Sequence, residues 1–180
     1  VLLTFFCSSA ALSRWRRQLK ARRTANVVTK MGARDAWQVA ANGGVFVAML
    51  ALNLVWPHPG WGIAALGAMA AATADTWATE IGTALGRDPW SLRTRQRVVA
   101  GTSGAITTMG TAGFFAGAAV TTLAGVWTGL DRMALVAAAT GGVCGAFVDT
   151  LLGATIQERR WCTTCRLLTE QATHACGTST

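Results

Sequence analysis

Long apolar stretches dominate the chain, and four of them are about as long as the hydrocarbon core of a bilayer is thick. A spanning α-helix needs about 20 mostly apolar residues. Stretches of this kind cover residues 38–56, 61–86, 102–127 and 133–155. No alternation with a period of two, which strands with turns would show, is evident. The pattern predicts an all-α fold, a multi-pass transmembrane helical bundle with four complete spans.

The two ends of the chain differ from these spans. Residues 1–12 form a shorter apolar run that is followed by a basic cluster, so we expect them to be the end of an earlier spanning helix of a longer protein. The alternative is the apolar region of a signal peptide, although no basic segment precedes the run. Residues 156–180 are polar. The predicted organisation is therefore a bundle over residues 1–155 and a tail over residues 156–180.

Positive charges fall in alternate connections between the spans. Fifteen Lys and Arg residues lie in segments 13–37, 87–101 and 156–180, whereas the other two connections hold only Arg132. The positive-inside rule places the basic connections and the tail in the cytoplasm. Only 13% of residues are charged, compared with about 25% in soluble domains, and the net charge is +8. A nucleic-acid-binding patch would have no reason to follow this alternation, so the expected partner is the lipid bilayer and not nucleic acid.

Three acids lie inside the predicted spans, towards their cytoplasmic ends: Asp75, Glu80 and Asp149. A carboxylate at such depth costs roughly 2.5–3.5 kcal/mol, so it usually faces a cavity and marks a functional site. Helical spacing puts Asp75, Thr79 and Gly82 on one face. We predict that the three acids are catalytic and hold Mg²⁺. For Glu80 the alternative is a structural pair with a loop arginine.

Basic and glycine-rich groups lie at the same membrane boundary. Residues 101–104 are predicted to open the third helix, where free amides, hydroxyls and nearby guanidinium groups would bind phosphate. No GxxxxGK[ST] or GxGxxG motif occurs. Asn42 is equally suited to an interhelical hydrogen bond. Acids for a divalent cation beside groups for phosphate predict phosphoryl or nucleotidyl chemistry on a lipid. The candidate phosphate-binding or nucleotide-binding residues are Lys30, Arg34, Asp35, Asn42, Arg95, Arg97, Gly101, Thr102, Ser103 and Gly104.

Glycines recur at a spacing of four residues in three of the predicted spans. The pairs are Gly82 with Gly86, Gly113 with Gly117, and Gly141 with Gly145. Small residues at this spacing favour close helix packing in lipid, although glycine is also tolerated in membrane helices without such a role. We expect these pairs to face neighbouring helices.

The tail contains a cluster of metal-ligand residue types. Cys162, Cys165, His174 and Cys176 have the spacing C-x2-C-x8-H-x-C. Three thiolates and one imidazole would complete a tetrahedral Zn²⁺ site. A redox-active CxxC pair and the absence of any shared role are the alternatives, and disulfides are disfavoured in the cytoplasm.

Several of these motifs resemble a family of integral membrane proteins that was described as a domain of unknown function and includes plant phytyl-phosphate kinase and the animal transmembrane protein nineteen. The matching motifs are KMGARDAWQVAANG at 30–43, AATADTWATEIG at 71–82, GTSG at 101–104, DTLLGAT at 149–155 and the cysteine tail. The resemblance covers nearly the whole chain. It implies a membrane-embedded isoprenyl-phosphate kinase that takes phosphoryl from a nucleoside triphosphate, with CTP among the candidate donors.

Two other functions compete with this kinase hypothesis. An ion-coupled transporter would also use intramembrane acids, but such sites usually lie near the bilayer midplane between repeats. Here the acids lie towards one face, and no internal repeat is evident. A structural scaffold would leave the cost of acids at depth unexplained.

Overall fold

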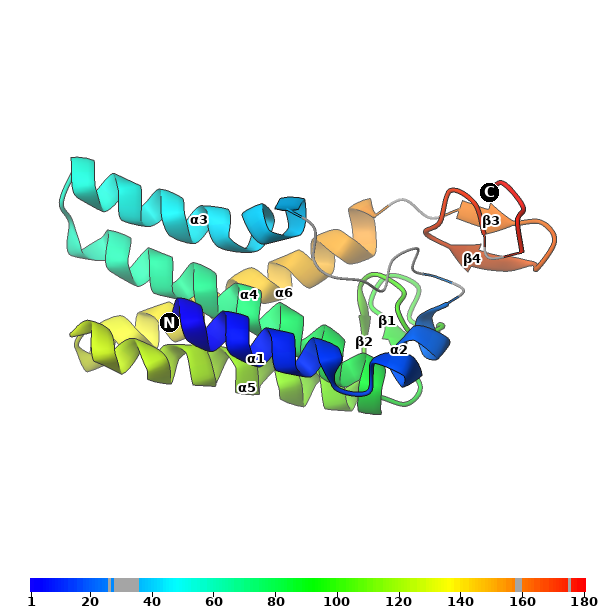
Figure 1. Cartoon of the computed structure of the whole chain (residues 1–180), viewed down its shortest axis with the longest axis horizontal. Helices are drawn as coiled ribbons and strands as arrows, with labels where there is room; N and C mark the ends of the chain where they lie inside the picture. Colours follow the sequence, from blue (N-terminus) through cyan, green and yellow to red (C-terminus); the bar gives the residue numbers. More distant parts are fainter. Residues whose placement is uncertain (26, 28–35, 158–159, 175) are drawn as a thin grey trace.

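The computed structural model describes residues 1–25, 27, 36–157, 160–174 and 176–180. Within these residues the chain is mostly helical (Figure 1). The helices are α1 (Leu2–Arg14), α2 (Arg17–Thr24), α3 (Ala36–Val55), α4 (Pro59–Leu85), α5 (Thr108–Ala124), the short 3₁₀ helix η1 (Gly125–Thr128) and α6 (Arg132–Ile156). The strands are β1 (Trp90–Ser91), β2 (Ala105–Ile106), β3 (Arg160–Cys162) and β4 (Leu167–Thr169).

Side-chain caps explain where α4 and α6 begin. His58 Nδ1 accepts a hydrogen bond from Gly60 N–H at 3.0 Å, and Pro59 occupies the first helical position of α4, where its missing N–H costs nothing. Asp131 Oδ1 accepts from Ala134 N–H at 2.9 Å and begins α6. For the second and fourth predicted spans, the observed helices agree closely with the apolar pattern.

The expected start of the third span is wrong. We predicted that residues 101–104 would open this helix, but α5 begins at Thr108, and Thr107 Oγ1 caps it by accepting from Gly110 N–H at 2.9 Å. Residues 105–106 form β2 instead and pair antiparallel with β1. Gly101 and Gly104 have φ angles of +93° and +71°, which a right-handed helix does not accommodate. The fold is therefore helical with two small two-stranded sheets, β1–β2 and β3–β4, rather than purely α.

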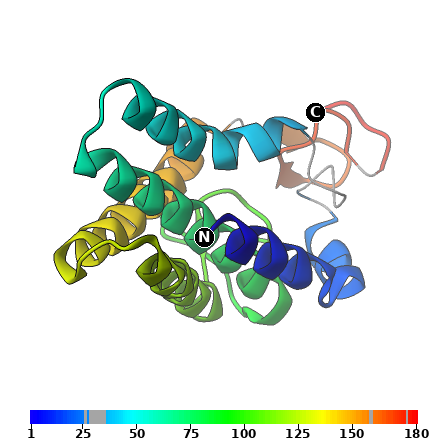
Figure 2. The same cartoon turned by 60° about the vertical axis from the view of Figure 1, so that its left-hand side comes forward.

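Helix α4 is the centre of the bundle and contacts α1, α2, α3, α5 and α6 (Figure 2). Its seam with α5 is built from glycine, because a Cβ at Gly117 would lie only 2.8 Å from the Thr73 carbonyl oxygen. In α6 the prediction is wrong for Gly141, which has nothing within 4 Å, whereas a Cβ at Gly145 would lie 3.5 Å from Ala71 Cβ and one at Gly142 would lie 2.6 Å from Ala70 Cβ. A shift of one residue turns a helix position by about 100°, so adjacent glycines face different surroundings.

Among the described residues, two helical stretches are long and apolar enough to cross a membrane, Thr108–Thr128 with 21 residues and Arg132–Ile156 with 25. Only 33% of the apolar part of the first stretch and 17% of that of the second are buried inside the protein, so most of this apolar surface is exposed. The predicted count of four spans is not established, because α3 and α4 do not meet the same criteria over their described residues.

The irregular segments gather at one end of the bundle. In Figure 1, α2, the β1–β2 loop and the β3–β4 tail all lie beyond the same ends of α4 and α6. Most of the basic residues belong to these segments. The opposite end holds the short connections between α3 and α4 and between α5 and α6.

Candidate functional site

A cavity of about 450 Å³ opens between α4, α5, α6 and the β1–β2 loop. One part of its wall is polar and carries carboxylates and hydroxyls. Phenylalanine and aliphatic side chains form the rest. The polar side chains are Asp75, Thr79, Thr83, Thr102, Ser103, Thr107, Thr111, Asp149 and Thr150, and the larger apolar ones are Leu92, Ile106, Phe114, Phe115 and Phe147.

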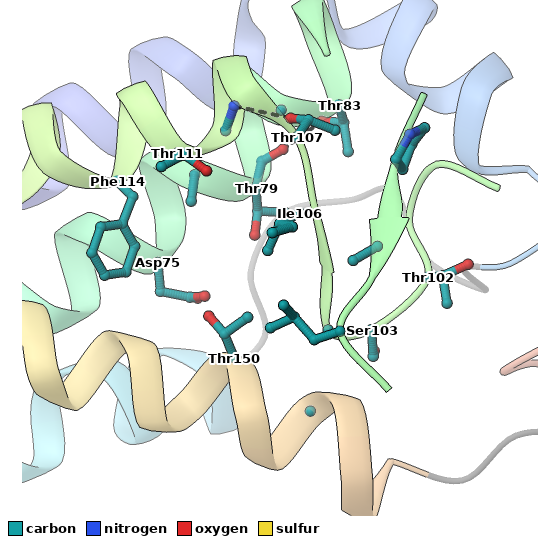
Figure 3. Close-up of a pocket in the computed structure, with 18 of the residues that line it drawn as sticks. Asp75, Thr79, Thr83, Thr102, Ser103, Ile106, Thr107, Thr111, Phe114 and Thr150 are labelled. Carbon is teal, nitrogen blue, oxygen red and sulfur yellow. Dashed lines mark hydrogen bonds between the residues drawn. The ribbon is translucent and has the colours of Figure 1, made fainter. Parts of the chain in front are cut away.

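Helix α4 presents Asp75 to this cavity. Asp75, Thr79 and Gly82 all line it, as their helical spacing predicted. Figure 3 shows the Asp75 side chain pointing from α4 towards α6, where it faces Thr150. The half-buried position of Asp75 lets its carboxylate meet a ligand without full exposure to solvent.

Helix α6 supplies the second carboxylate. Asp149 lines the same cavity together with Thr150 and Gly153. Thr150 Oγ1 donates to the Ala146 carbonyl at 3.0 Å, which fixes its rotamer while leaving its oxygen able to accept. Two acids from different helices thus share one hollow, and no lysine or arginine among the described residues lines it. Carboxylate oxygens that line a cavity in this way can act as ligands of a cation.

Residues 101–104, which we call the glycine loop, form the wall opposite α4. The loop packs tightly on α6, because a Cβ at Gly104 would lie 2.2 Å from Ala154 Cβ. The Leu92 N–H donates to the Gly104 carbonyl at 3.3 Å and ties the loop to the segment after β1. The loop therefore lines the cavity as predicted, but as an irregular turn and not as a helix N-terminus.

Several donors of the glycine loop already have partners. Thr102 Oγ1 donates to the Val99 carbonyl at 2.8 Å. Ser103 N–H donates to Glu170 Oε1 at 2.8 Å, and Ser103 Oγ donates to Glu170 Oε2 at 3.0 Å. The predicted phosphate cradle thus holds an internal carboxylate, which comes from the tail.

The structure does not bring Glu80 into the cavity. Its carboxylate pairs with Lys20 Nζ and accepts a hydrogen bond from Ser13 Oγ. Lys20 is 2% exposed and also donates to the carbonyls of Leu12 at 2.7 Å and Ser13 at 3.1 Å. The alternative interpretation of Glu80 as a structural pair fits this geometry, although the partner is a lysine between α1 and α4 and not a loop arginine.

The predicted basic residues lie elsewhere. Arg97 is exposed and pairs with Asp88 at 3.1 Å, and neither Arg95 nor Arg97 lines the cavity. Asn42 is half-buried on α3 and does not line it either. The remaining predicted residues, Lys30, Arg34 and Asp35, lie outside the described residues.

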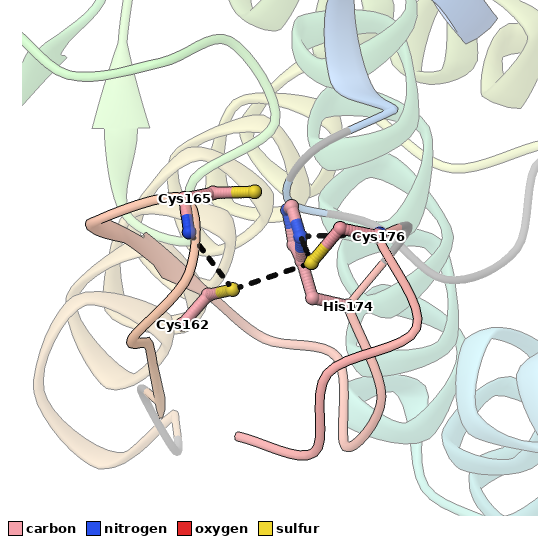
Figure 4. Close-up of side chains that lie close together, drawn as sticks. All are labelled: Cys162, Cys165, His174 and Cys176. Atoms are coloured by element: carbon pink, nitrogen blue, oxygen red, sulfur yellow. Dashed lines mark hydrogen bonds between the residues drawn. The ribbon is translucent and has the colours of Figure 1, made fainter.

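The four metal-ligand residues of the tail do come together. One ligand atom from each of Cys162, Cys165, His174 and Cys176 lies within 4.8 Å of the others (Figure 4). Cys162 and His174 are buried, and His174 Nε2 has no hydrogen-bond partner in the described part of the chain. This cluster can hold a metal ion.

Hydrogen bonding sets the protonation of two of these thiols in the absence of metal. A hydrogen bond with the Thr178 side chain, and then one with His174, lowers the pKa of Cys176 to about 5. A hydrogen bond with Cys176 raises the pKa of Cys165 to about 11. Cys176 is thus a thiolate at neutral pH, the form that binds metal.

Sequence reasoning did not identify two parts of the site. The cavity-lining Phe114, Phe115 and Phe147 were treated only as apolar span residues, although they are the aromatic side chains of α5 and α6. The contact of Glu170 with the glycine loop was also missed. No local pattern could have revealed this contact, because the two residues are far apart in the chain.

The fold and the site together define a helical protein with two stretches long and apolar enough to cross a membrane and an acidic, partly apolar cavity at one end of its bundle. Comparison with known families places it further: residues 1–180 match the family described as integral membrane protein DUF92, and the chain belongs to this family. The predicted family resemblance is thereby confirmed.

Two relatives illustrate the family. The chain is 27% identical over 193 residues to Protein PGR of Arabidopsis thaliana, and the match covers 90% of this chain and 65% of that protein. It is 30% identical over 162 residues to the uncharacterized membrane protein MJ0933 of Methanocaldococcus jannaschii, covering 88% of this chain and 65% of that protein. The chain thus spans just under two-thirds of the length of each relative. No solved structure matches it.

Proposed function

We propose that this chain forms the core of a membrane-embedded isoprenyl-phosphate kinase. The observation that carries the proposal is that Asp75 of α4 and Asp149 of α6 line one cavity of about 450 Å³ together with the glycine loop. The cavity combines acids and hydroxyls with phenylalanine side chains, which suits a substrate with a phosphate head and an isoprenyl chain. The family resemblance to plant phytyl-phosphate kinase supports the same reaction.

In the proposed reaction an oxygen of the prenyl monophosphate attacks the γ-phosphorus of a nucleoside triphosphate, CTP among the candidates. The bond from the γ-phosphorus to the bridging oxygen breaks, the nucleoside diphosphate leaves, and prenyl diphosphate forms. Asp75 and Asp149 would hold Mg²⁺, which offsets phosphate charge during transfer. All polar side chains that line the cavity offer oxygen atoms, the ligand type that Mg²⁺ prefers.

The chain's own residues have distinct roles in this proposal. The hydroxyls of Thr79, Thr111 and Thr150 would hydrogen-bond the phosphate oxygens. Phe114 and Phe147 would contact the isoprenyl chain where the cavity meets lipid. Lys30 and Arg34 stay sequence-based candidates for phosphate binding, whereas Glu80 is assigned to the pair with Lys20 and leaves the proposed metal site.

We further propose that the cavity opens on the cytoplasmic side. It lies at the bundle end that carries α2, the β1–β2 loop and the tail, where the basic residues are concentrated (Figure 1). The positive-inside rule assigns this end to the cytoplasm, where nucleoside triphosphates are found. Cysteine-accessibility labelling at Thr163 and Thr128, in intact and permeabilised cells, tests the assignment. Labelling of a Thr163→Cys tail from outside intact cells would contradict it.

We also propose that the tail binds one Zn²⁺. Three sulfur ligands and one imidazole nitrogen within 4.8 Å of one another match the preference of structural zinc sites. Metal analysis of the purified full-length protein should give one zinc per chain. A Cys162→Ser, Cys165→Ser double variant should lose it, and a wild-type protein that retains no zinc would contradict the proposal.

The kinase proposal is tested by incubating the purified full-length protein in detergent with labelled nucleoside triphosphate, Mg²⁺ and farnesyl, geranylgeranyl or phytyl monophosphate. We expect labelled prenyl diphosphate from at least one of them, and none after chelation of Mg²⁺. If none forms while a known kinase works in the same mixture, the proposal is wrong. Ion uptake by proteoliposomes that is lost in Asp149→Asn would instead support a transporter.

A further inference from the structure

We propose that the metal-held cysteine tail acts as a clamp on the cavity, with Glu170 as the positioning residue that holds the glycine loop. The loop itself is part of the described fold. Its influence on substrate binding, however, rests on the proposed function. The clamp assigns a role to a tail that the kinase chemistry does not otherwise use.

Two hydrogen bonds join the tail to the glycine loop. Both carboxylate oxygens of Glu170 accept from one residue, Ser103, through its N–H at 2.8 Å and its hydroxyl at 3.0 Å. A charged acceptor makes these bonds stronger than neutral ones. Because Ser103 lines the cavity and Glu170 does not, the carboxylate holds the loop from behind.

The loop lies between the tail and α6. Its other side packs on Ala154, which leaves no room for a Cβ at Gly104. Loss of the contact with Glu170 would therefore remove two hydrogen bonds that hold the loop on the side of the tail, while its packing on α6 stays. The cavity wall at Thr102 and Ser103 would then lose its fixed position.

The tail is also anchored to the end of α2. Glu170 N–H donates to the Val27 carbonyl at 3.2 Å, and Gln171 Nε2 donates to the Ala25 carbonyl at 3.1 Å. Val27 and Gln171 are buried by this contact. These bonds hold the backbone of Glu170 and the side chain of Gln171 against the segment that follows α2, so the position of the Glu170 carboxylate depends on the tail being folded.

Metal binding is what can fold the tail. Glu170 lies in the chain between Cys165 and His174, so a metal ion bound by the four ligands closes the segment that carries it. The β3–β4 ladder consists of only three residue pairs, and a short isolated hairpin is marginal in water. In such small units the free energy of metal binding supplies the free energy of folding.

The test is hydrogen exchange followed by mass spectrometry on the full-length protein in nanodiscs. The samples are the zinc-loaded protein, the same protein after treatment with a chelator, and the variants Glu170→Ala, Glu170→Gln and Ser103→Ala. Thr163→Ala is the control, because Thr163 is an exposed tail residue between two ligands. Peptides from α5 serve as the internal reference for global unfolding.

We expect chelation and Glu170→Ala each to speed exchange over residues 99–106 by about tenfold or more, with α5 unchanged. Glu170→Gln keeps one acceptor oxygen and should give a smaller effect. Adding Ser103→Ala to Glu170→Ala should produce little further change, because the two residues share one interaction.

Exchange over residues 99–106 that stays slow when the tail is stripped of metal would overturn the proposal. So would a Glu170→Ala effect no larger than that of Thr163→Ala. None of these measurements needs a substrate. If no kinase activity is found but the loop responds as expected, the clamp stands and the proposed function fails.

Discussion

Helix α4 carries two acids, five residues apart, on two different faces, and the surroundings of their carboxylates differ. Asp75 faces α6 and the glycine loop across a cavity that it shares with a second acid, Asp149. Glu80 faces α1 and α2, where Lys20 and Ser13 satisfy it. Five residues turn an α-helix by about 140°, so the two side chains meet different neighbours.

The depth of an acid in a membrane helix therefore does not by itself show that the acid has a functional role. Glu80 already has a buried cation as its partner, so its charge stabilises the junction of α1, α2 and α4. Asp75 and Asp149 line one cavity, and no lysine or arginine of the described residues lines it with them. What faces each carboxylate decides its role.

The largest expected effect is on the cavity face. Asp75→Asn removes a proposed Mg²⁺ ligand and should lower prenyl-phosphate phosphorylation by at least about 100-fold, with the thermal unfolding of the protein little changed. Asp88→Asn, at an exposed acid in the connection between α4 and β1, is the matched control and should keep activity. Equal losses in the two variants would contradict a specific role for Asp75.

Substitution of Glu80, on the other face of α4, should change the stability of the protein rather than its activity. Glu80→Gln leaves the buried Lys20 without its carboxylate and should cost about 3 kcal/mol of unfolding free energy. Activity per folded molecule should persist. Combining it with Lys20→Met should restore part of the loss, because both charges are then gone. A Glu80 variant that folds normally but is inactive would remove the distinction between the two faces.

A smaller effect is expected where α5 packs on α4 beside the cavity. Gly117→Ala places a methyl group 2.8 Å from the Thr73 carbonyl oxygen, and the overpacking should cost about 1–3 kcal/mol in a detergent unfolding assay. Gly141→Ala, which meets nothing within 4 Å, should change stability by less than about 0.5 kcal/mol. Equal behaviour of the two variants would show that the α4–α5 seam is not close-packed.

The smallest effect should come from Arg97. Its pair with Asp88 is exposed on both sides, and such pairs contribute about 0.2–1 kcal/mol. Arg97→Gln should therefore leave stability almost unchanged and alter the KM for nucleotide less than about twofold, since Arg97 does not line the cavity. A large rise in KM would return Arg97 to the phosphate-binding set.

Much of the helical framework could be predicted from apolar runs and breakers. The start of α4 at Pro59 and of α6 at Arg132 follows from local caps that the sequence contains. The start of α5 could not be predicted, because residues 101–107 are apolar or small enough to extend the helix. The pairing of β2 with β1 keeps these residues out of the helix, and it depends on a segment that is distant in the sequence. The cap at Thr107 is local, like those of α4 and α6, and is a signal that the sequence analysis did not use.

For the candidate site too, part could be predicted from the sequence and part could not. The spacing of Asp75, Thr79 and Gly82 placed them on one face, and the ligand spacing of the tail indicated a metal cluster. The partner of Glu80 could not be predicted, since a sequence shows that a carboxylate is costly but not which distant cation offsets it. The same limit hid the contact of Glu170 with Ser103.

By itself, the sequence determined that the chain is a helical membrane protein with acids near one end of its spans and a compact set of thiols after the last one. These properties depend on hydropathy, helical period and ligand spacing, which act over a few turns of chain. Only the tertiary structure decided which acids share a cavity, which glycines touch another helix and what holds the glycine loop. Those outcomes depend on the rotation of each helix about its axis and on contacts between distant segments, where one residue of shift exchanges one neighbour for another.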